Sequence, residues 1–157
     1  MEQRILRAVT EAANYVAEQI KREIEDQGHR ATGELIDSVE VDVSVQGDRI
    51  VGTVKLNDYA KYLNEKQQPH YPPFSAIYDW AKVVRRDLSD KEQRSFAWAV
   101  VNKIGEEGMP TSGARAFSKN GRRTEWAKYA IADNLQEIRN RLRLNEVFRE
   151  TIIQQFA

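Results

Sequence analysis

The chain has 157 residues and no cysteine, and its 24 basic side chains are balanced by 24 acidic ones. The missing thiols exclude disulfides, thiol nucleophiles and thiolate metal ligands. Zero net charge gives no overall reason for binding nucleic acid or a membrane surface. A hydrophobic fraction of 41% is enough for a core, and the length fits one domain.

The first half of the chain predicts a helix followed by a β-hairpin. Apolar residues recur every three or four positions from about Gln3 to Gln27, which predicts a long helix with one buried face that ends at Gly28. Valines then alternate with polar residues at positions 39–46, and the alternation resumes at positions 49–56 after a Gly-containing turn. One face of this hairpin is polar, so we expect the long helix to cover the other face.

The second half is predicted to be helical. Tyr59 and Tyr62 suggest a short helical turn whose aromatic side is buried. A helix is expected from Phe74 or Ser75 to about Arg86, directly after two prolines that suit a helix start. Another begins at a capping box of Ser89 and Glu92, and Gly105 and Gly108 are expected to end it.

A long loop and a last helix follow. Residues 109–123 are predicted to form a loop of a length that is usually functional or ordered by a partner. One helical register runs from Thr124 to Leu142, and the apolar register then slips. We therefore predict a single α+β domain over residues 1–143, with a small, mainly antiparallel sheet packed by the N-terminal helix. Residues 144–157 are predicted to form a helical arm that needs a docking surface, in its own subunit or in a neighbour.

The sequence offers little catalytic chemistry. His29 and His70 fall in predicted loops without other ligands at metal-binding spacing, so we assign them structural or solvent-facing roles. Adjacent carboxylates such as Glu106 and Glu107 fit a solvated helix face, although a carboxylate pair formed in space would leave an enzyme as a further hypothesis. We predict no enzyme activity, no cofactor and no metal.

Two features suggest contacts with partners. Trp98 lies off the apolar face of its predicted helix, so it either packs on a neighbouring helix or serves as an interface anchor. The loop after Met109 has no acidic residue from Thr111 to Thr124. It is either a solvated loop, a phosphate contact for nucleic acid or a segment that orders on an acidic protein surface. Its candidate contact residues are Arg115, Phe117, Lys119, Arg122 and Arg123, and those of the arm are Phe148, Ile152 and Phe156.

Two short motifs flank the predicted hairpin. A Thr-Gly-x-Leu-x-x-Ser segment enters it, and a Tyr-Ala-x-Tyr-x-x-Glu segment leaves it. A Pro-Pro helix with Ile and Trp follows, and then an Ala-containing helix that ends in Ile-Gly-x-x-Gly. The motif residues are Thr32, Gly33, Leu35, Ser38, Tyr59, Ala60, Tyr62, Glu65, Pro72, Pro73, Ile77, Trp80, Ala97, Ile104, Gly105 and Gly108. In this order the motifs resemble the tail-component or head–tail joining proteins of tailed bacteriophages, the tail-completion or neck type.

The resemblance implies a structural virion protein without catalysis. Such a protein would be a ring-forming subunit at the head–tail junction or in the tail, made in the bacterial cytoplasm and ending in the particle. Its partners would be its own copies and other virion proteins, such as portal, connector or tail-tube proteins, with non-specific contact to packaged DNA. The alternative is a small nucleic-acid-binding accessory protein that uses the basic loop. We expect the loop or the arm to carry contacts between subunits.

Overall fold

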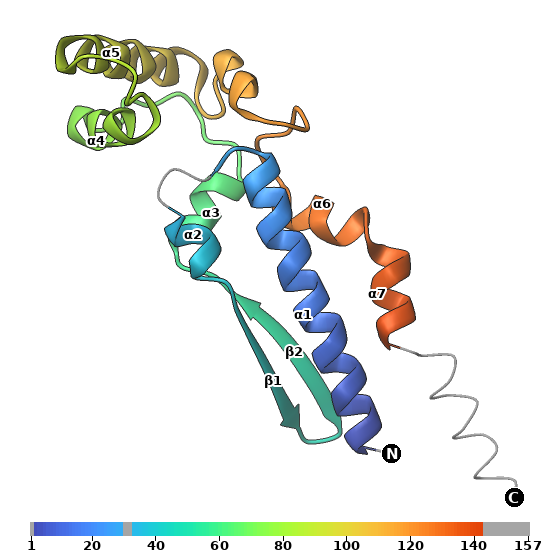
Figure 1. The fold of residues 1–157 in the computed structure, drawn as a ribbon. Coiled ribbons are helices and arrows are strands. Elements are labelled where there is room, and N and C mark those ends of the chain that lie inside the picture. The colour runs from blue at the N-terminus through green and yellow to red at the C-terminus, as the bar shows by residue number, and fades with distance from the viewer. Residues whose placement is uncertain (1, 30–32, 143–157) are drawn as a thin grey trace, which may run out of the picture. The chain divides into compact units, whose positions relative to one another are not determined.

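The computed structural model of the chain describes residues 2–29 and 33–142. Its elements are the helices α1 (Glu2–Asp26) and α2 (Glu34–Asp37), the strands β1 (Glu40–Gln46) and β2 (Arg49–Lys55), the helices α3 (Tyr59–Asn64), α4 (Phe74–Val84) and α5 (Asp90–Glu107), the 3-10 helix η1 (Ser112–Phe117), and the helices α6 (Trp126–Ala132) and α7 (Leu135–Leu142). The predicted α+β class, with a long N-terminal helix, a central antiparallel hairpin and a helical second half, is confirmed (Figure 1).

The chain divides into two compact units. Unit 1 comprises Met1–Glu23, Ser38–Asn57 and Ala127–Ala157, and unit 2 comprises Ile24–Asp37 and Asp58–Trp126. Unit 1 therefore holds most of α1, the hairpin, most of α6, and α7. Unit 2 holds the end of α1, the short helix α2, and the elements from α3 to η1.

In unit 1 the hairpin packs on α1 through a position without a side chain. Val43 pairs with Gly52 across the two strands, so both residues face the same side of the sheet. A Cβ atom on Gly52 would lie 3.1 Å from the Cβ atom of Ala13 and 3.1 Å from Cγ1 of Val9. The missing side chain thus allows close approach of helix and sheet. The long helix thus packs against one face of the hairpin, as predicted.

The C-terminal helices of unit 1 contact another side of α1 (Figure 1). The hydroxyl of Tyr15 donates to Oδ1 of Asn134 at 3.0 Å, and the guanidinium of Arg141 lies 4.3 Å from the centre of the Tyr15 ring. The prediction of a single helix from Thr124 to Leu142 is wrong, because the helix is interrupted between α6 and α7. The side-chain amide of Asn134 donates to the carbonyl of Ala130 at 2.9 Å, a local bond that competes with helix continuation.

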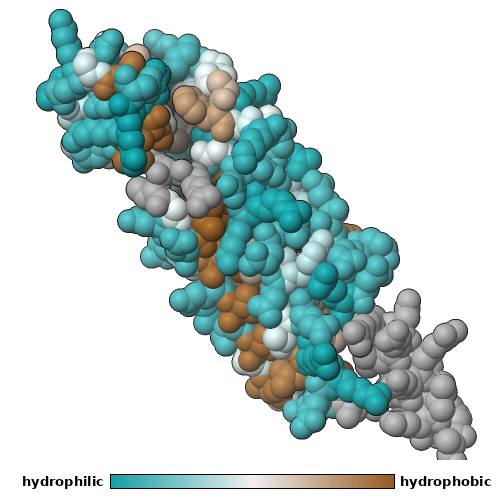
Figure 2. Space-filling view, in the orientation of Figure 1, coloured by the Kyte–Doolittle hydropathy of each residue, from teal (hydrophilic) through white to brown (hydrophobic). Residues whose placement is uncertain are grey.

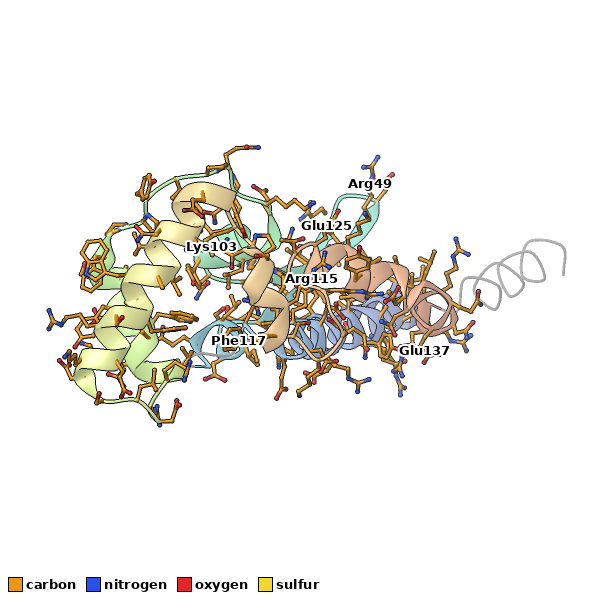
Figure 3. The ribbon with its side chains drawn as sticks, turned by 90° about the horizontal axis from the view of Figure 1, so that it is seen from above. Arg49, Lys103, Arg115, Phe117, Glu125 and Glu137 are labelled. Atoms are coloured by element: carbon orange, nitrogen blue, oxygen red, sulfur yellow. The ribbon has the colours of Figure 1, made fainter. Side chains whose placement is uncertain are left out.

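In unit 2, α4 and α5 form a helical hairpin (Figures 1 and 3). Ala81 of α4 and Ala97 of α5 are completely buried, and small side chains allow two helices to approach closely. The predicted capping box is present, because Ser89 and Glu92 exchange side-chain to backbone hydrogen bonds at the start of α5. The prediction that Gly105 ends the helix is wrong, because Gly105 lies inside α5, whereas Gly108 ends it as predicted, with a φ of +78° that suits glycine at a helix C-terminus.

Candidate interaction surfaces

The apolar face of the hairpin is only partly covered. None of the residues of β1 and β2 is fully buried, and the side chain of Val45 is 50% exposed. Figure 2 shows a band of apolar side chains along the hairpin. The sheet has two strands among the described residues, so each strand also leaves one edge without a partner strand. This surface offers both apolar side chains and free backbone groups.

A second exposed surface lies on the α4–α5 hairpin. The indole of Trp98 stacks on the ring of Phe74 with a centroid distance of 4.5 Å, and Phe74 stacks on Tyr78 at 5.6 Å. Trp98 is nevertheless 52% exposed. Trp98 therefore packs on the neighbouring helix and still presents apolar area, and its role as an interface anchor stays a prediction. Phe74 and Tyr78 were not singled out from the sequence, although their i, i+4 spacing places them on one face of α4.

Trp80, the aromatic motif residue of α4, is less exposed than Trp98. Trp80 is half-buried and stacks on Phe96 with a centroid distance of 5.8 Å, and Ile77 is also half-buried. Pro73 caps α4, since its carbonyl accepts the backbone N–H of Ala76 at 3.1 Å. Pro72 and Pro73 thus stand directly before the helix, as predicted, and Trp80 has a packing role.

The short helix α3 forms as predicted, but its aromatic residues do not point inward. Tyr59 is 57% exposed and Tyr62 is 61% exposed, so the expectation of a buried aromatic side is wrong. The buried residue of α3 is Ala60. The sequence pattern of so short a helix favours its tyrosine rings as the core residues. A close contact with a neighbouring element can instead require a small side chain such as that of Ala60.

The motif that enters the hairpin has clear local roles. Gly33 has a φ of +87°, and its carbonyl accepts the backbone N–H of Asp37 at 3.0 Å, which forms the turn of α2. Leu35 is buried. Oγ of Ser38 accepts the backbone N–H of Asn57 at 3.2 Å and so ties the start of the hairpin to its end. Thr32 lies outside the described residues.

Within unit 2, the basic loop packs on the end of α1 and on the residues that follow it. The backbone N–H of Lys119 donates to the carbonyl of Asp26 at 2.7 Å, and its ammonium lies 3.8 Å from the Asp26 carboxylate. The side-chain amide of Gln27 donates to the carbonyl of Thr124 at 3.0 Å. A Cβ atom on Gly28 would lie 1.9 Å from the carbonyl oxygen of Phe117, so the loop needs glycine at this point.

The candidate cations of this loop are not equivalent. Arg123 is half-buried, its guanidinium donates to the carbonyl of Gln27, and burial lowers the pKa of its side chain. Arg115 is exposed on η1, beside Phe117, which is 45% exposed (Figure 3). Arg122 is half-buried. Arg115 and Phe117 are therefore the loop residues best placed to meet a partner.

His29 has a structural role in this loop contact. Its Nε2 lies 3.1 Å from the carbonyl oxygen of Arg123, so the neutral ring can donate to that oxygen. Burial, and then the positive charge of Arg123, lower the pKa of His29 to about 4. His70 is exposed, and its Nδ1 lies 2.8 Å from the carbonyl oxygen of Gln68.

Three predicted contact residues of the arm, Phe148, Ile152 and Phe156, lie outside the described residues. Across residues 2–29 and 33–142 there is no group of three or more His, Cys, Asp or Glu side chains that could hold a metal ion. In the same part of the chain, no helix has the length and apolar character needed to cross a bilayer.

The family match of the chain falls on the segment made of α1, α2, the hairpin and α3. Residues 2–65 match a bacteriophage protein family. Its model is described as "Bacteriophage HK97-gp10, putative tail-component". The match covers less than half of the chain, and it ends at Glu65, the last residue of the second hairpin motif. The resemblance to phage tail components is thus confirmed over this segment, while the motifs from Pro72 onward lie beyond it. No curated protein and no solved structure matches the chain.

Proposed function

We propose that the chain is a structural protein of a tailed-bacteriophage particle, a ring-forming subunit at the head–tail junction or in the tail. The match of residues 2–65 to a phage tail-component family is the observation that carries this proposal. Its partners are other copies of the chain and other virion proteins, such as portal, connector or tail-tube proteins. It is made in the host cytoplasm, ends in the particle, and works without catalysis or a cofactor.

The surfaces of the two units support an assembly role. The hairpin exposes Val45 and two strand edges, and β-strand addition uses such edges to join chains. The α4–α5 hairpin exposes Trp98, a residue type favoured at interface centres. On η1, Arg115 and Phe117 form a third exposed pair. A protein that functions through contacts needs several such surfaces, each matched to one neighbour.

The alternative role, nucleic-acid binding by the basic loop, has weaker support. Arg123 is used inside unit 2, and Lys119 lies near Asp26, so the loop presents fewer free cations than its sequence suggests. Non-specific contact of Arg115 with packaged DNA remains part of our proposal for a subunit near the DNA channel. Binding through so few phosphate contacts should be weak at physiological salt.

Localisation in the particle tests the proposed function directly. Purified particles of a phage that encodes the chain should contain the protein at a fixed number of copies, measured by quantitative mass spectrometry. An antibody against the chain should label the neck or the tail in negative-stain images, and not the capsid shell. Particles that lack the protein altogether would contradict the proposal. Light scattering over a concentration series, followed by imaging, would show whether free subunits form rings.

A further inference from the structure

We propose that the hairpins of neighbouring copies pair edge to edge, so that β2 of one copy joins β1 of the next in an antiparallel sheet. The occupant of each free strand edge is then the opposite edge of a second copy. This inference rests on the proposed function, because it names the contact that links one subunit to the next. A head-to-tail contact of this kind uses two different surfaces of one chain, and it closes into a ring where the rotation between copies allows it.

Both outer edges of the hairpin direct backbone groups away from the sheet. The two strands pair position by position over 7 residues each, and a two-residue turn joins them. Beside such a turn the closing pair exchanges hydrogen bonds, and hydrogen-bonded pairs then alternate with pairs that are not. In the second kind of pair, the N–H and C=O groups point outward. The residues in these pairs are Val41, Val43 and Val45 on β1 and Ile50, Gly52 and Val54 on β2.

The two edges are accessible and lack the usual protection. Gly52 is exposed although its face of the sheet packs on α1, and the exposed area of a glycine belongs to its backbone. On β1, Val43 is half-buried and Val45 is 50% exposed. Residues 40–46 and 49–55 contain no proline, and their register has no bulge. Two of the devices that keep strand edges from pairing are therefore missing here.

The charged side chains of the hairpin select which edges meet. All charges on β1 are negative and all charges on β2 are positive, and the residues are exposed: Glu40, Asp42, Arg49 and Lys55. Opposite charges already meet on this face within one hairpin, because Nζ of Lys55 lies 3.1 Å from the Asp42 carboxylate. The same attraction favours β2 of one copy beside β1 of the next. Pairing two β1 edges or two β2 edges would instead bring like charges together.

The register between copies repeats the register within the hairpin. It places Lys55 of one copy opposite Glu40 of the next on the polar face of the sheet. On the apolar face it places Ile50 opposite the exposed Val45, and a cross-strand pair of β-branched residues is favourable. The outward-facing residues of the two edges can then exchange up to about six backbone hydrogen bonds. Backbone pairing thus supplies the contact, and the charges set its direction.

The test mixes two variants of the full-length chain, each with one reversed charge. Glu40→Lys alone would set two lysines opposite each other at every junction between copies, and Lys55→Glu alone would set two glutamates there. Each variant alone should need about 10-fold higher concentration than the wild type to associate, as light scattering measures it. In an equimolar mixture the two variants can alternate, so that every junction joins a lysine to a glutamate. The mixture should therefore regain association.

Mixing separates the junction from the hairpin of each chain. Glu40 and Lys55 are also direct partners within one hairpin, so each substitution sets like charges against each other there as well. Mixing leaves that internal defect in place and repairs only the junction, and circular dichroism would verify that both variants keep their fold. Lys91→Glu reverses an exposed charge on α5 and should associate as the wild type does. High salt should shrink the difference between the separate and the mixed variants.

Engineered cysteines locate the contact, because the chain has none of its own. Ser44 and Val51 are partners in the hairpin, and the repeated register sets Ser44 of one copy opposite Val51 of the next. Across the junction this pair is not hydrogen-bonded, so its side chains come close enough for a disulfide. A mixture of Ser44→Cys and Val51→Cys chains should form a cross-linked dimer under a mild oxidant. Each variant alone should form much less of it.

Several results would overturn the inference. A mixture of the charge variants that associates no better than its components would mean that Glu40 and Lys55 do not meet between copies. Ser44→Cys or Val51→Cys chains that cross-link as well alone as in the mixture would refute the pairing of unlike edges. A wild-type chain that is monomeric at every concentration would refute the contact between copies. If the protein is then still found in phage particles, the proposed function stands and only this contact fails.

Discussion

A Cβ atom on Gly52 would lie 3.1 Å from the Cβ atom of Ala13, a distance shorter than ordinary van der Waals contact. The hairpin and α1 are therefore packed so closely at this position that an added Cβ atom would push its neighbours aside. Gly52→Val should separate the two elements and lower the free energy of unfolding by about 1–3 kcal/mol, as overpacking does. Denaturant unfolding followed by circular dichroism would measure the change.

The adjacent residue in β2 provides the control for this prediction. Thr53 pairs with Asp42 on the opposite, polar face of the hairpin, and it is exposed. Thr53→Val also introduces a β-branched apolar side chain, and it should change the free energy of unfolding by no more than about 0.5 kcal/mol. Equal effects of the two substitutions would show that Gly52 is not a packing requirement.

Gly28 should be essential for the docking of the basic loop. Its φ of +75° disfavours any other residue, and an added Cβ atom would lie 1.9 Å from the carbonyl oxygen of Phe117. Gly28→Ala should therefore cost more than the roughly 1–3 kcal/mol of backbone strain alone. It should also expose the loop, so trypsin should cleave after Lys119 or Arg122 faster than in the wild type.

Gly121 provides a control that separates the effect of backbone strain from the effect of the close contact at Gly28. It has a similar φ of +74°, but an added Cβ atom would meet nothing within 4 Å. Gly121→Ala should then carry only the backbone strain, and it should leave the tryptic rate less affected than Gly28→Ala does. The same loss of stability in both variants would mean that the close contact at Gly28 contributes nothing.

The stability of the chain should depend on pH through His29. The pKa of this ring is about 4 in the folded chain, against an ordinary value of 6.5. Below pH 6.5 the unfolded chain binds the proton more readily, so the free energy of unfolding falls as the pH drops from about 6.5 to about 4. The full loss is up to about 3 kcal/mol, at 1.36 kcal/mol per pKa unit.

Two substitutions test the assignment to His29. His29→Gln should reduce the slope of stability against pH between pH 6.5 and 4, whatever its effect on absolute stability. His70→Gln changes an exposed ring and should leave the slope as in the wild type. Unfolding curves at a series of pH values provide the measurement. A slope that survives His29→Gln would assign the pH dependence to other groups.

The capping box of α5 should contribute to stability on its own. Oγ of Ser89 accepts the backbone N–H of Glu92, and the Glu92 carboxylate accepts the backbone N–H of Ser89. Ser89→Ala should cost about 1 kcal/mol. Ser95→Ala, at an exposed position inside the same helix, should be neutral or slightly stabilising because alanine favours helices. Thermal or denaturant unfolding of both variants would decide.

The sequence by itself determined the elements whose causes are local. The alternating valines predict the hairpin because side chains alternate faces along a strand. Ser89 and Glu92 predict the start of α5 because both partners of the capping box lie within one turn. The match of residues 2–65 to a phage tail-component family includes the hairpin and its flanking motifs, which the sequence alone also revealed.

Only the tertiary structure decided which residues meet across long stretches of chain. The bond from Tyr15 to Asn134 joins residues more than a hundred positions apart, next to the break that a continuous apolar pattern did not reveal. The sequence marks Arg123 as a candidate contact residue, but its guanidinium donates to the carbonyl of Gln27. Trp98 is half-exposed because Phe74 supports only one face of its indole. Periodicity reports which face of an element is apolar, whereas the partner of that face depends on contacts that no local pattern encodes.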